Sequence, residues 1–438
     1  MLFTNARPVL TLKMQDYTDH SFVIVTDDLV VHEPIIIIDD SNFTDYGFSG
    51  DGTKTTPYLI ENWQIITNED YSIHVKNTTK YFVIRDCHVE ADLYAIGITD
   101  VANGTAIIYN NSCSGDGGIL IDESDFSLIT NNTCYEGNVG IVTYYSKNSI
   151  IFNNTCTTNY FDAIRTYYST SSTIANNTFV DGGLTIIENY VEDYDTYLVE
   201  NNTVNTKPVG YLVSEMDISF LNPSFGQLIL IDCTNVTVSN QDFSNVGYGL
   251  YYVFCTNTTT TNNTFSYNTY GANFRQSIGY NIIEGNRFIE NNDFAINLVG
   301  TDYVTLENNS IFSNGNGIRI GDSDYTILNN NSLIDNHNGI IILDGIYNNI
   351  TNNLFQDNID YAIHIDAISY GNLIYNNSFK DNNDGGIQCF DDGSVGNNTW
   401  YNSVTMKGNY WSDWSSVGNY TLDGAHGVAD LYPLDYIP

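Results

Sequence analysis

An asparagine recurs along the chain in steps of 21 to 25 residues, apart from one step of 61, and an apolar residue follows two positions later. The asparagines are Asn111, Asn132, Asn154, Asn177, Asn202, Asn263, Asn286, Asn309, Asn331, Asn353, Asn377 and Asn398. The apolar residues are Cys113, Cys134, Cys156, Phe179, Val204, Phe265, Phe288, Ile311, Leu333, Phe355, Phe379 and Trp400. Residues two apart on a strand share a face, so each pair predicts a short strand with an inward amide and an inward apolar side chain.

The second half of the repeat predicts another strand. A Gly or Ala precedes an Ile-x-Ile pair, as in Gly317 to Ile320, Gly339 to Ile342 and Ala362 to Ile365. A second asparagine column lies between the two strands, and because Asn tolerates the left-handed conformation we expect it to mark corners. Its members are Asn159, Asn268, Asn291, Asn314, Asn336, Asn358 and Asn382.

These repeats predict an all-β fold, a single right-handed parallel β-helix of about 15 coils with 21 to 25 residues each and an inward asparagine ladder. Stacking lets each buried amide donate to one neighbour and accept from the other. A leucine-rich repeat has a similar period, but no helical spacing of Leu occurs here. We expect an N-terminal arm or strand over residues 1–33, the β-helix over 34–400 with a loop insertion near 215–226, and a C-terminal cap over 401–438.

Charge limits the partners. The chain carries 52 acidic against 14 basic residues, a formal charge of −38. Such a surface repels nucleic acid and anionic lipid. No apolar run reaches the roughly 18 residues of a membrane span, so we expect no membrane insertion. The first residues also lack the apolar stretch of a signal peptide, so that an export leader was either removed or never present.

Motifs at both ends resemble those of a known family. Pro34 to Ile38, Ser49 to Thr53 and Pro57 to Glu61 resemble the entry motif of the NosD-like parallel β-helix repeat proteins, and Gly408 to Trp414 resembles their closing motif. The resemblance implies a secreted or surface protein of archaea or bacteria. The family's name comes from a factor in copper-enzyme maturation, but four Met and seven His without repeated spacing do not predict a copper site.

The family's closing segment usually continues into a calcium-binding loop. Here only Asp413, Asp423 and Asp430 are candidate carboxylate ligands, whereas calcium needs six to eight oxygens. We therefore expect a cap without a cofactor, with Ca²⁺ as the alternative.

Cysteines and tyrosines recur in register. Cys233 and Cys255 share the frame Cys-Thr-Asn, 22 residues apart, and are a disulfide candidate between neighbouring coils in an oxidising compartment. Cys113, Cys134 and Cys156 are expected to be stacked thiols in the core. The pairs Tyr144, Tyr145 and Tyr167, Tyr168 lie 23 residues apart and are candidates for glycan binding.

Sequons for N-glycosylation are frequent, and many place their acceptor directly before a ladder asparagine, where it should point outward. They are Asn42, Asn77, Asn103, Asn110, Asn131, Asn153, Asn176, Asn201, Asn235, Asn257, Asn262, Asn308, Asn330, Asn349, Asn376, Asn397 and Asn419.

We expect a non-enzymatic structural or adhesive element outside the cell, which binds glycans or other surface proteins or assembles end to end into a filament or surface layer. The alternative is a polysaccharide-degrading lyase or glycoside hydrolase. Its acid-base candidates are Asp324, Asp344, Asp366, Arg319 and His364, which the repeat places on neighbouring coils. No local motif ties them together, so hydrated turn residues explain them more simply.

Overall fold

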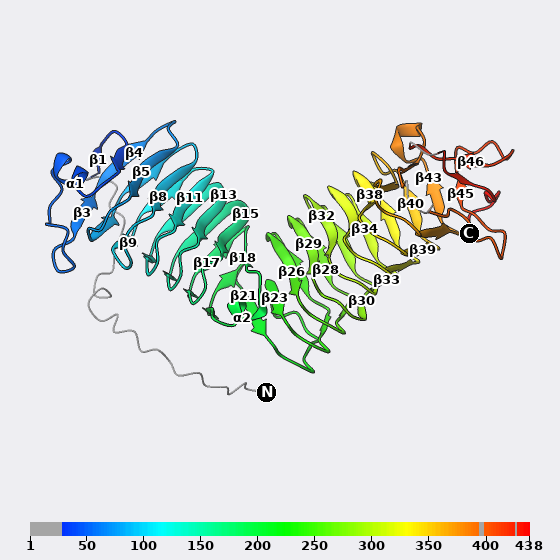
Figure 1. Ribbon diagram of the computed structural model, residues 1–438, viewed down its shortest axis with the longest axis horizontal. Coiled ribbons are helices and arrows are strands. Elements are labelled where there is room, and N and C mark those ends of the chain that lie inside the picture. The colour runs from blue at the N-terminus through cyan, green and yellow to red at the C-terminus, as the bar shows by residue number, and fades with distance from the viewer. Residues whose placement is uncertain (1–28, 394–397, 425–426) are drawn as a thin grey trace.

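The computed structural model describes residues 29–393, 398–424 and 427–438 of the chain. It is a right-handed parallel β-helix of about 14 turns, which confirms the predicted fold (Figure 1). Helices are confined to α1 (Asn42–Asp45), α2 (Val191–Tyr194) and the 3₁₀ turn η2 (Asn383–Gly385) among these residues. Most of the predicted N-terminal arm lies outside the described residues.

Most coils contribute three strands, which stack in register into three rows. Row one holds β2 (Ile35–Ile37), β5 (Tyr71–Lys76), β8 (Tyr94–Thr99), β11 (Gly117–Asp122), β13 (Thr133–Tyr144), β15 (Thr155–Tyr167), β18 (Leu184–Ile187), β21 (Lys207–Val213), β23 (Gln227–Ile231), β26 (Tyr248–Val253), β29 (Tyr270–Arg275), β32 (Phe294–Val299), β35 (Asn316–Gly321), β38 (Asn338–Leu343), β41 (Ile363–Ile365) and β44 (Cys389–Asp391). Row two holds β3 (Tyr58–Glu61), β6 (Phe82–Arg85), β9 (Ala106–Tyr109), β12 (Leu128–Thr130), β14 (Ile150–Phe152), β16 (Thr173–Ala175), β19 (Leu198–Glu200), β22 (Ser219–Phe220), β24 (Thr237–Ser239), β27 (Thr259–Thr261), β30 (Asn281–Glu284), β33 (Val304–Glu307), β36 (Ile327–Asn329), β39 (Asn349–Thr351) and β42 (Leu373–Tyr375). Row three holds β1 (Val30–Val31), β4 (Trp63–Ile66), β7 (His88–Glu90), β10 (Ser112–Ser114), β17 (Thr178–Val180), β20 (Thr203–Val204), β25 (Asp242–Ser244), β28 (Thr264–Ser266), β31 (Arg287–Ile289), β34 (Ser310–Phe312), β37 (Ser332–Ile334), β40 (Leu354–Gln356), β43 (Ser378–Lys380) and β45 (Tyr410–Trp411). In β13 and β15 rows three and one merge into single strands, and β46 (Tyr420–Thr421) pairs antiparallel with β47 (Ala429–Asp430).

The predicted asparagine ladder lies buried at the corner between rows two and three. The Oδ1 of Asn154 accepts hydrogen bonds from the backbone N–H and the Nδ2 of Asn132, at 2.9 and 3.0 Å. The Nδ2 of Asn132 also donates to the carbonyl of Ile108 at 3.0 Å. Each rung therefore satisfies both its own amide and the backbone of a neighbouring coil, as a buried polar group requires.

Two details of the prediction were wrong. The second asparagine column does not take the left-handed conformation: Asn291 and Asn314 are buried rungs of another ladder, and the left-handed residues are their predecessors, Glu290 and Ser313. The side chain of Asn159 is outside the described set. Asn398 is not the last rung of the first ladder, because Asn409 follows Asn377 there, with 3.0 Å between Nδ2 and Oδ1.

A third ladder, at the corner between rows one and two, runs from Asn348 through Asn372 to Asn398. All three ladders end at an aspartate in the C-terminal coils. Each amide donates to the next coil, so the last amide needs an acceptor that does not itself donate, and a carboxylate is one. The first ladder ends where the backbone N–H of Asn409 donates to Asp430 at 2.7 Å. The second ends where Gln388 donates to Asp413 at 2.6 Å, and the third where Asn398 donates to Asp391 at 2.9 Å.

The winding is interrupted once, between two parts that we call the first stack (residues 30–204) and the second stack (residues 207–434). Asn205 and Thr206 both have positive φ, and they form a tight turn that pairs β20 antiparallel with β21. The two stacks meet at an angle (Figure 1). Residues 215–226, predicted as a loop insertion, contain β22 and belong to the first coil of the second stack.

The end of the first stack packs on the side of the second stack. In β23, Leu228 and Leu230 point into the core of the second stack, whereas Ile229 and Ile231 are buried in the core of the first. The buried side-chain amide of Gln227 bridges the gap, since its Oε1 accepts from the N–H of Leu184 at 2.8 Å and its Nε2 donates to the carbonyl of Leu184 at 2.9 Å. The two stacks thus share apolar and polar contacts.

Both outer ends of the solenoid are covered. At the N-terminal end α1 places Phe43, fully buried, against Tyr58 with ring centroids 4.6 Å apart. At the C-terminal end Trp411 stacks on Tyr420 of β46 at 4.0 Å. No helix in the described ranges is long and apolar enough to cross a membrane.

Candidate functional site

The outward side chains of row one form a surface that carries stacked aromatic rings and charged groups, and we call it the outer face. In the first stack Tyr71 and Tyr94 stack at 6.1 Å, and Tyr144 and Tyr167 stack at 4.5 Å with an angle of 6° between the rings. All four half-buried rings pack on Leu120, Val139 and Val142, which form a small apolar cluster outside the main core. The predicted stacking of Tyr144 on Tyr167 is thus found in the structure.

The second stack has rings at the first residue of its row-one strands, as Tyr71 and Tyr94 are in the first stack, whereas Tyr144 and Tyr167 are the last residues of β13 and β15. Tyr248 of β26 stacks on Tyr270 of β29 at 4.8 Å, and Tyr270 faces Phe294 of β32 at 6.3 Å. Together the seven rings define the aromatic band, whose members are Tyr71, Tyr94, Tyr144, Tyr167, Tyr248, Tyr270 and Phe294. In Figure 1 the strands β13 and β15 on one side and β26 and β29 on the other border the notch between the stacks. The aromatic band therefore spans the junction.

A buried ion pair lies between the two halves of the band. Asp162 is fully buried and accepts from the Nε of Arg165 at 2.5 Å and from Thr185 at 2.7 Å. Although burial opposes it, the Asp162 carboxylate raises the pKa of Arg165. Arg165 also reaches the hydroxyl of Tyr167 at 3.5 Å, so the pair positions a ring of the band.

Burial raises the pKa of several hydroxyls of the band above the ordinary value for tyrosine. It raises the pKa of Tyr144 to about 12, with a further contribution from Tyr167. It also raises the pKa of Tyr248 and of Tyr270, to which Asp162 and Asp293 respectively contribute. These phenols can therefore donate and accept hydrogen bonds at neutral pH.

Sequence reasoning found only part of this face. Tyr145 and Tyr168 stack at 5.1 Å as expected, but both have positive φ and follow the ends of β13 and β15 at a corner. Tyr71, Tyr94, Tyr248, Tyr270 and Phe294 were missed. A signal was present for the last four, because each directly precedes the Gly or Ala that begins the apolar part of a row-one strand, as in Tyr270-Gly271.

The acid-base candidates do not form one group. Arg319 and His364 lie on the outer face, two coils apart with Ile341 between them in register. Asp344 and Asp366 lie at a corner, where the Asp366 carboxylate accepts from the backbone N–H of Asp344 at 3.2 Å and from Ser369 at 2.6 Å.

The fifth candidate, Asp324, accepts from the N–H of Ile346 at 2.9 Å. Burial raises its pKa. The carboxylates of Asp324 and Asp366 therefore behave as turn residues that hold backbone N–H groups, and Asp344 is held through its own N–H.

The metal candidates are also separate. Asp430 is buried and accepts from the indole of Trp411 at 3.0 Å, Asp413 accepts from Tyr420 at 2.9 Å, and Asp423 accepts from Tyr361 at 3.0 Å. In the described part of the chain no three His, Cys, Asp or Glu side chains are arranged to hold a metal ion. The donor set fits neither calcium nor copper.

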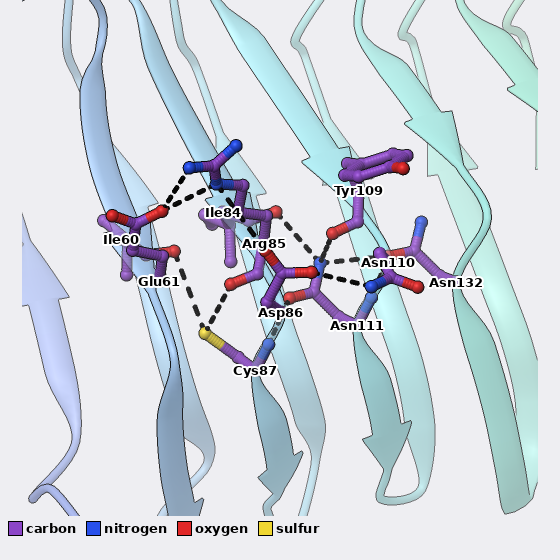
Figure 2. Close-up of polar contacts among 10 residues, drawn as sticks. All are labelled: Ile60, Glu61, Ile84, Arg85, Asp86, Cys87, Tyr109, Asn110, Asn111 and Asn132. Carbon is purple, nitrogen blue, oxygen red and sulfur yellow. Dashed lines mark hydrogen bonds and ion pairs between the residues drawn. The ribbon is translucent and has the colours of Figure 1, made fainter. Parts of the chain in front are cut away.

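Sequon asparagines face outward. Figure 2 shows one sequon asparagine and the ladder asparagine that follows it. Asn110 points outward and donates to Asp86 at 2.6 Å, whereas Asn111 points inward and donates to the carbonyl of Ile84 at 2.9 Å. Asn397 lies outside the described residues, and the other predicted acceptors are all exposed or half-buried. Glycosylation at these positions stays a prediction.

The cysteines lie in the core as free thiols. Cys113, Cys134 and Cys156 stack in register and are fully buried. Cys233 and Cys255 are on adjacent coils as expected, but the backbone N–H of Cys233 donates to the Sγ of Cys255 at 3.4 Å and no disulfide joins them.

Two family models match the chain. The model described as periplasmic copper-binding protein (NosD) matches residues 220–358 and 322–416, and the model of the right-handed β-helix region matches residues 101–225. No curated protein matches in sequence.

Several solved structures are similar to the chain at a low level. A periplasmic alginate epimerase, AlgG, crystallised as a double mutant, is 14% identical over 78% of this chain and 84% of its own, with a TM-score of 0.33. PfbA, a surface adhesin of Streptococcus pneumoniae, is 12% identical over 72% of this chain and 92% of its own, with a TM-score of 0.28. An α-1,3-glucanase of Streptomyces thermodiastaticus is 11% identical over 85% of this chain and 71% of its own, with a TM-score of 0.30. Likenesses at this level assign neither a site nor a function.

Proposed function

Because the chain belongs to the NosD-like family of parallel β-helix repeat proteins, we propose that it is an extracytoplasmic, non-enzymatic binding protein that holds an extended glycan against its outer face. The observation that carries the proposal is the aromatic band, which runs along both stacks and across their junction. Copper has no part in it, since the donor set does not fit that metal.

The chemistry of the band suits a sugar chain. Tyrosine offers an apolar ring and a polar hydroxyl, so it can cover the C–H surfaces of a sugar while it exchanges hydrogen bonds with the sugar hydroxyls. The rings are held in place by stacking and by the apolar cluster beneath them, which reduces the conformational entropy lost on binding. A solenoid repeats such contacts along its axis, which suits a polymer more than a small molecule.

Assembly into a filament has less support. Axial stacking of chains needs open strand edges at the ends. Here Phe43 of α1 and the pair Trp411 and Tyr420 cover those ends.

Binding to a panel of soluble polysaccharides, measured by affinity electrophoresis and then by calorimetry, tests the proposal. Tyr167→Ala and Tyr270→Ala should each weaken binding about tenfold, as loss of a central aromatic contact does. Tyr303→Ala and Tyr325→Ala are matched controls, because these rings also stack, at 5.1 Å, but lie exposed at a different corner.

Equal losses in the band and control variants would contradict the site, and wild-type protein that binds no glycan would contradict the function. Release of new sugar ends during incubation would contradict the non-enzymatic part and favour the polysaccharide-degrading alternative.

A further inference from the structure

Five successive row-one strands of the second stack carry no acidic residue on the outer face, although Asp293 lies at its edge beside Tyr270. The chain has 52 acidic residues among 438, yet the five strands β26, β29, β32, β35 and β38 contain neither Asp nor Glu. They do contain Arg275 and Arg319, two of the six arginines of the chain. This surface is therefore locally favourable to an anion in a protein that otherwise repels anions.

Arg319 lies on this surface with its charge unpaired. It aligns with Asn297 of β32 on one side and Ile341 of β38 on the other. None of the ion pairs between described residues involves it, and its buried Nε has no hydrogen-bond partner. Gly321 makes room for the guanidinium, since a Cβ there would lie 3.2 Å from the Arg319 Nε.

The neighbouring amide is also incompletely bonded. Asn297 is 7% exposed, and its Nδ2 donates to the Oδ1 of Asn273 at 2.9 Å. Its Oδ1 is buried without any partner. A buried acceptor beside a buried donor, both unsatisfied, is rare in a folded protein and is expected where a ligand completes the bonding.

From this arrangement we infer that Arg319, Asn297 and Asn273 form a subsite for a carboxylate-bearing sugar, so that the glycan of the proposed function is a uronic-acid polymer. The inference rests on that proposed function. The guanidinium donates two parallel hydrogen bonds to a sugar carboxylate, and the Asn297 Oδ1 accepts from a neighbouring sugar hydroxyl. The charge of −38 does not prevent this for a short oligomer, because the Debye length is about 8 Å at physiological salt.

A trimer of galacturonic acid and its methyl ester are the matched ligands for the test, since esterification removes the charge of the carboxylates and adds only a methyl group to each. Calorimetry at physiological salt should show the acid bound at least tenfold more tightly than the ester. Arg319→Gln should reduce that preference to within about twofold, and Arg319→Lys should retain part of it. Arg287→Gln is the control: Arg287 lies in row three of the same stack over the ring of Phe312, at 4.9 Å, and its loss should change nothing.

The outcomes separate the subsite from the function. If acid and ester bind equally, or if Arg319→Gln keeps the preference while circular dichroism shows a folded protein, the subsite is wrong and the proposed glycan function stands. If a sulfated oligosaccharide binds more tightly than the uronate, the carboxylate assignment is overturned. If neither these trimers nor any neutral glycan binds, both proposals fail.

Discussion

The first and second stacks form the same corner, between rows three and one, in different ways. In the second stack a buried asparagine ladder from Asn268 to Asn382 supplies the hydrogen bonds of the corner. In the first stack glycines bring backbone against backbone, since a Cβ on Gly137 would lie 2.2 Å from the carbonyl oxygen of Gly115. There the two rows merge into the long strands β13 and β15.

The difference shows what an asparagine rung requires. Each rung of the second stack follows a left-handed residue, such as Glu290 or Asp335, but Glu136 before Gly137 in the first stack is left-handed as well, so this conformation alone does not produce a rung. In the first stack the chain has less room for an inward side chain, so close packing of the backbone takes the place of side-chain hydrogen bonds. Replacing a rung asparagine removes hydrogen bonds, whereas adding a side chain at Gly137 forces the coils apart. The two changes should therefore destabilise the protein for opposite reasons.

The largest effect is expected from Asn331→Leu, in the ladder between rows two and three. The Oδ1 of Asn331 accepts from the N–H and Nδ2 of Asn309, and its Nδ2 donates to the Oδ1 of Asn353 and the carbonyl of Leu306. Leucine removes all four bonds. The backbone N–H of Asn309 is left without an acceptor, at roughly 1 to 3 kcal/mol, and the other three lost bonds cost about 1 kcal/mol each, because the Nδ2 of Asn309 still donates to Ile283 and the Oδ1 of Asn353 still accepts from the backbone N–H of residue 331. We expect a loss of about 5 kcal/mol in the free energy of unfolding, measured by urea denaturation.

Asn330→Gly is its control. Asn330 is exposed with a φ of 57°, which glycine adopts easily, so the change should cost less than about 1 kcal/mol. Equal losses in the two variants would mean that the ladder does not stabilise the solenoid.

Much of the fold could be predicted because the ladder is periodic in sequence. The spacing of two residues between each Asn and the following apolar residue predicted which side chains point inward. The corner at Asn331 lies where this spacing predicted it. The assignment of Asn291 as a left-handed corner failed because either residue of such a pair can take that conformation, and Glu290 takes it here. The turn at Asn205 and Thr206 was missed because Asn-Thr lacks the glycine that usually marks a two-residue hairpin.

The next largest loss of stability is expected at Gly115 and Gly137, the closely packed glycines of the first stack. Gly137→Ala places a methyl group against the carbonyl of Gly115, a rigid backbone atom, so the coils must separate. Such overpacking should lower the free energy of unfolding by about 3 kcal/mol. Denaturation with the neighbouring Asn138→Ala as control measures it, because Asn138 loses only a side-chain bond to Asp116. A stable Gly137→Ala protein would show that the backbone contact is not tight.

A smaller effect is expected at the junction between the stacks. Asp162→Ala removes the fully buried carboxylate and leaves Arg165 unpaired. Breaking a buried pair typically costs 3 to 5 kcal/mol, but the Arg165 side chain is 23% exposed and regains some hydration, so we expect about 2 kcal/mol.

Small-angle scattering on the same variant should also report a change in the angle between the stacks. Arg85→Gln, which breaks an exposed pair with Glu61, should cost less than about 1 kcal/mol and leave the scattering unchanged. An Asp162→Ala protein with the wild-type scattering profile would show that the other contacts of the junction, such as those of Gln227 with Leu184, fix the angle without this ion pair.

The candidate site was harder to predict than the fold. In a parallel strand the inward residues repeat from coil to coil, but an outward residue such as Arg319 varies, and no period marks it. Tyr270 carried only the weaker signal that it directly precedes a Gly at the start of a strand. Asn297 looked like one more asparagine in a chain rich in them. The junction that joins the two halves of the aromatic band depends on contacts between distant residues, such as Leu184 and Gln227, which no local pattern encodes.

The smallest effect is expected on the pH dependence of stability. It is compared for His74 on the outer face of the first stack and His364 on that of the second. Burial lowers the pKa of His74, in the first stack, from its ordinary 6.5 to about 4, with Lys76 contributing. Burial also lowers the pKa of His364 in the second stack, but Asp366 and Asp360 oppose the change. Since the unfolded chain takes up its proton near pH 6.5 and folded His74 only near pH 4, the stability from His74 is complete above pH 6.5 and lost as the pH falls toward 4.

His74→Gln should therefore flatten the decline of the thermal midpoint between pH 6.5 and pH 4, and His364→Gln should flatten it less. Scanning calorimetry of wild type and both variants across this range measures the slopes. Because His74 also stacks on Tyr71 at 4.1 Å, its variant should start from a lower midpoint at neutral pH, and only the slope carries the comparison. A steeper or equal slope for His74→Gln would mean that this histidine is already protonated in the folded first stack, and that the ring of Tyr71 tolerates an imidazolium beneath it.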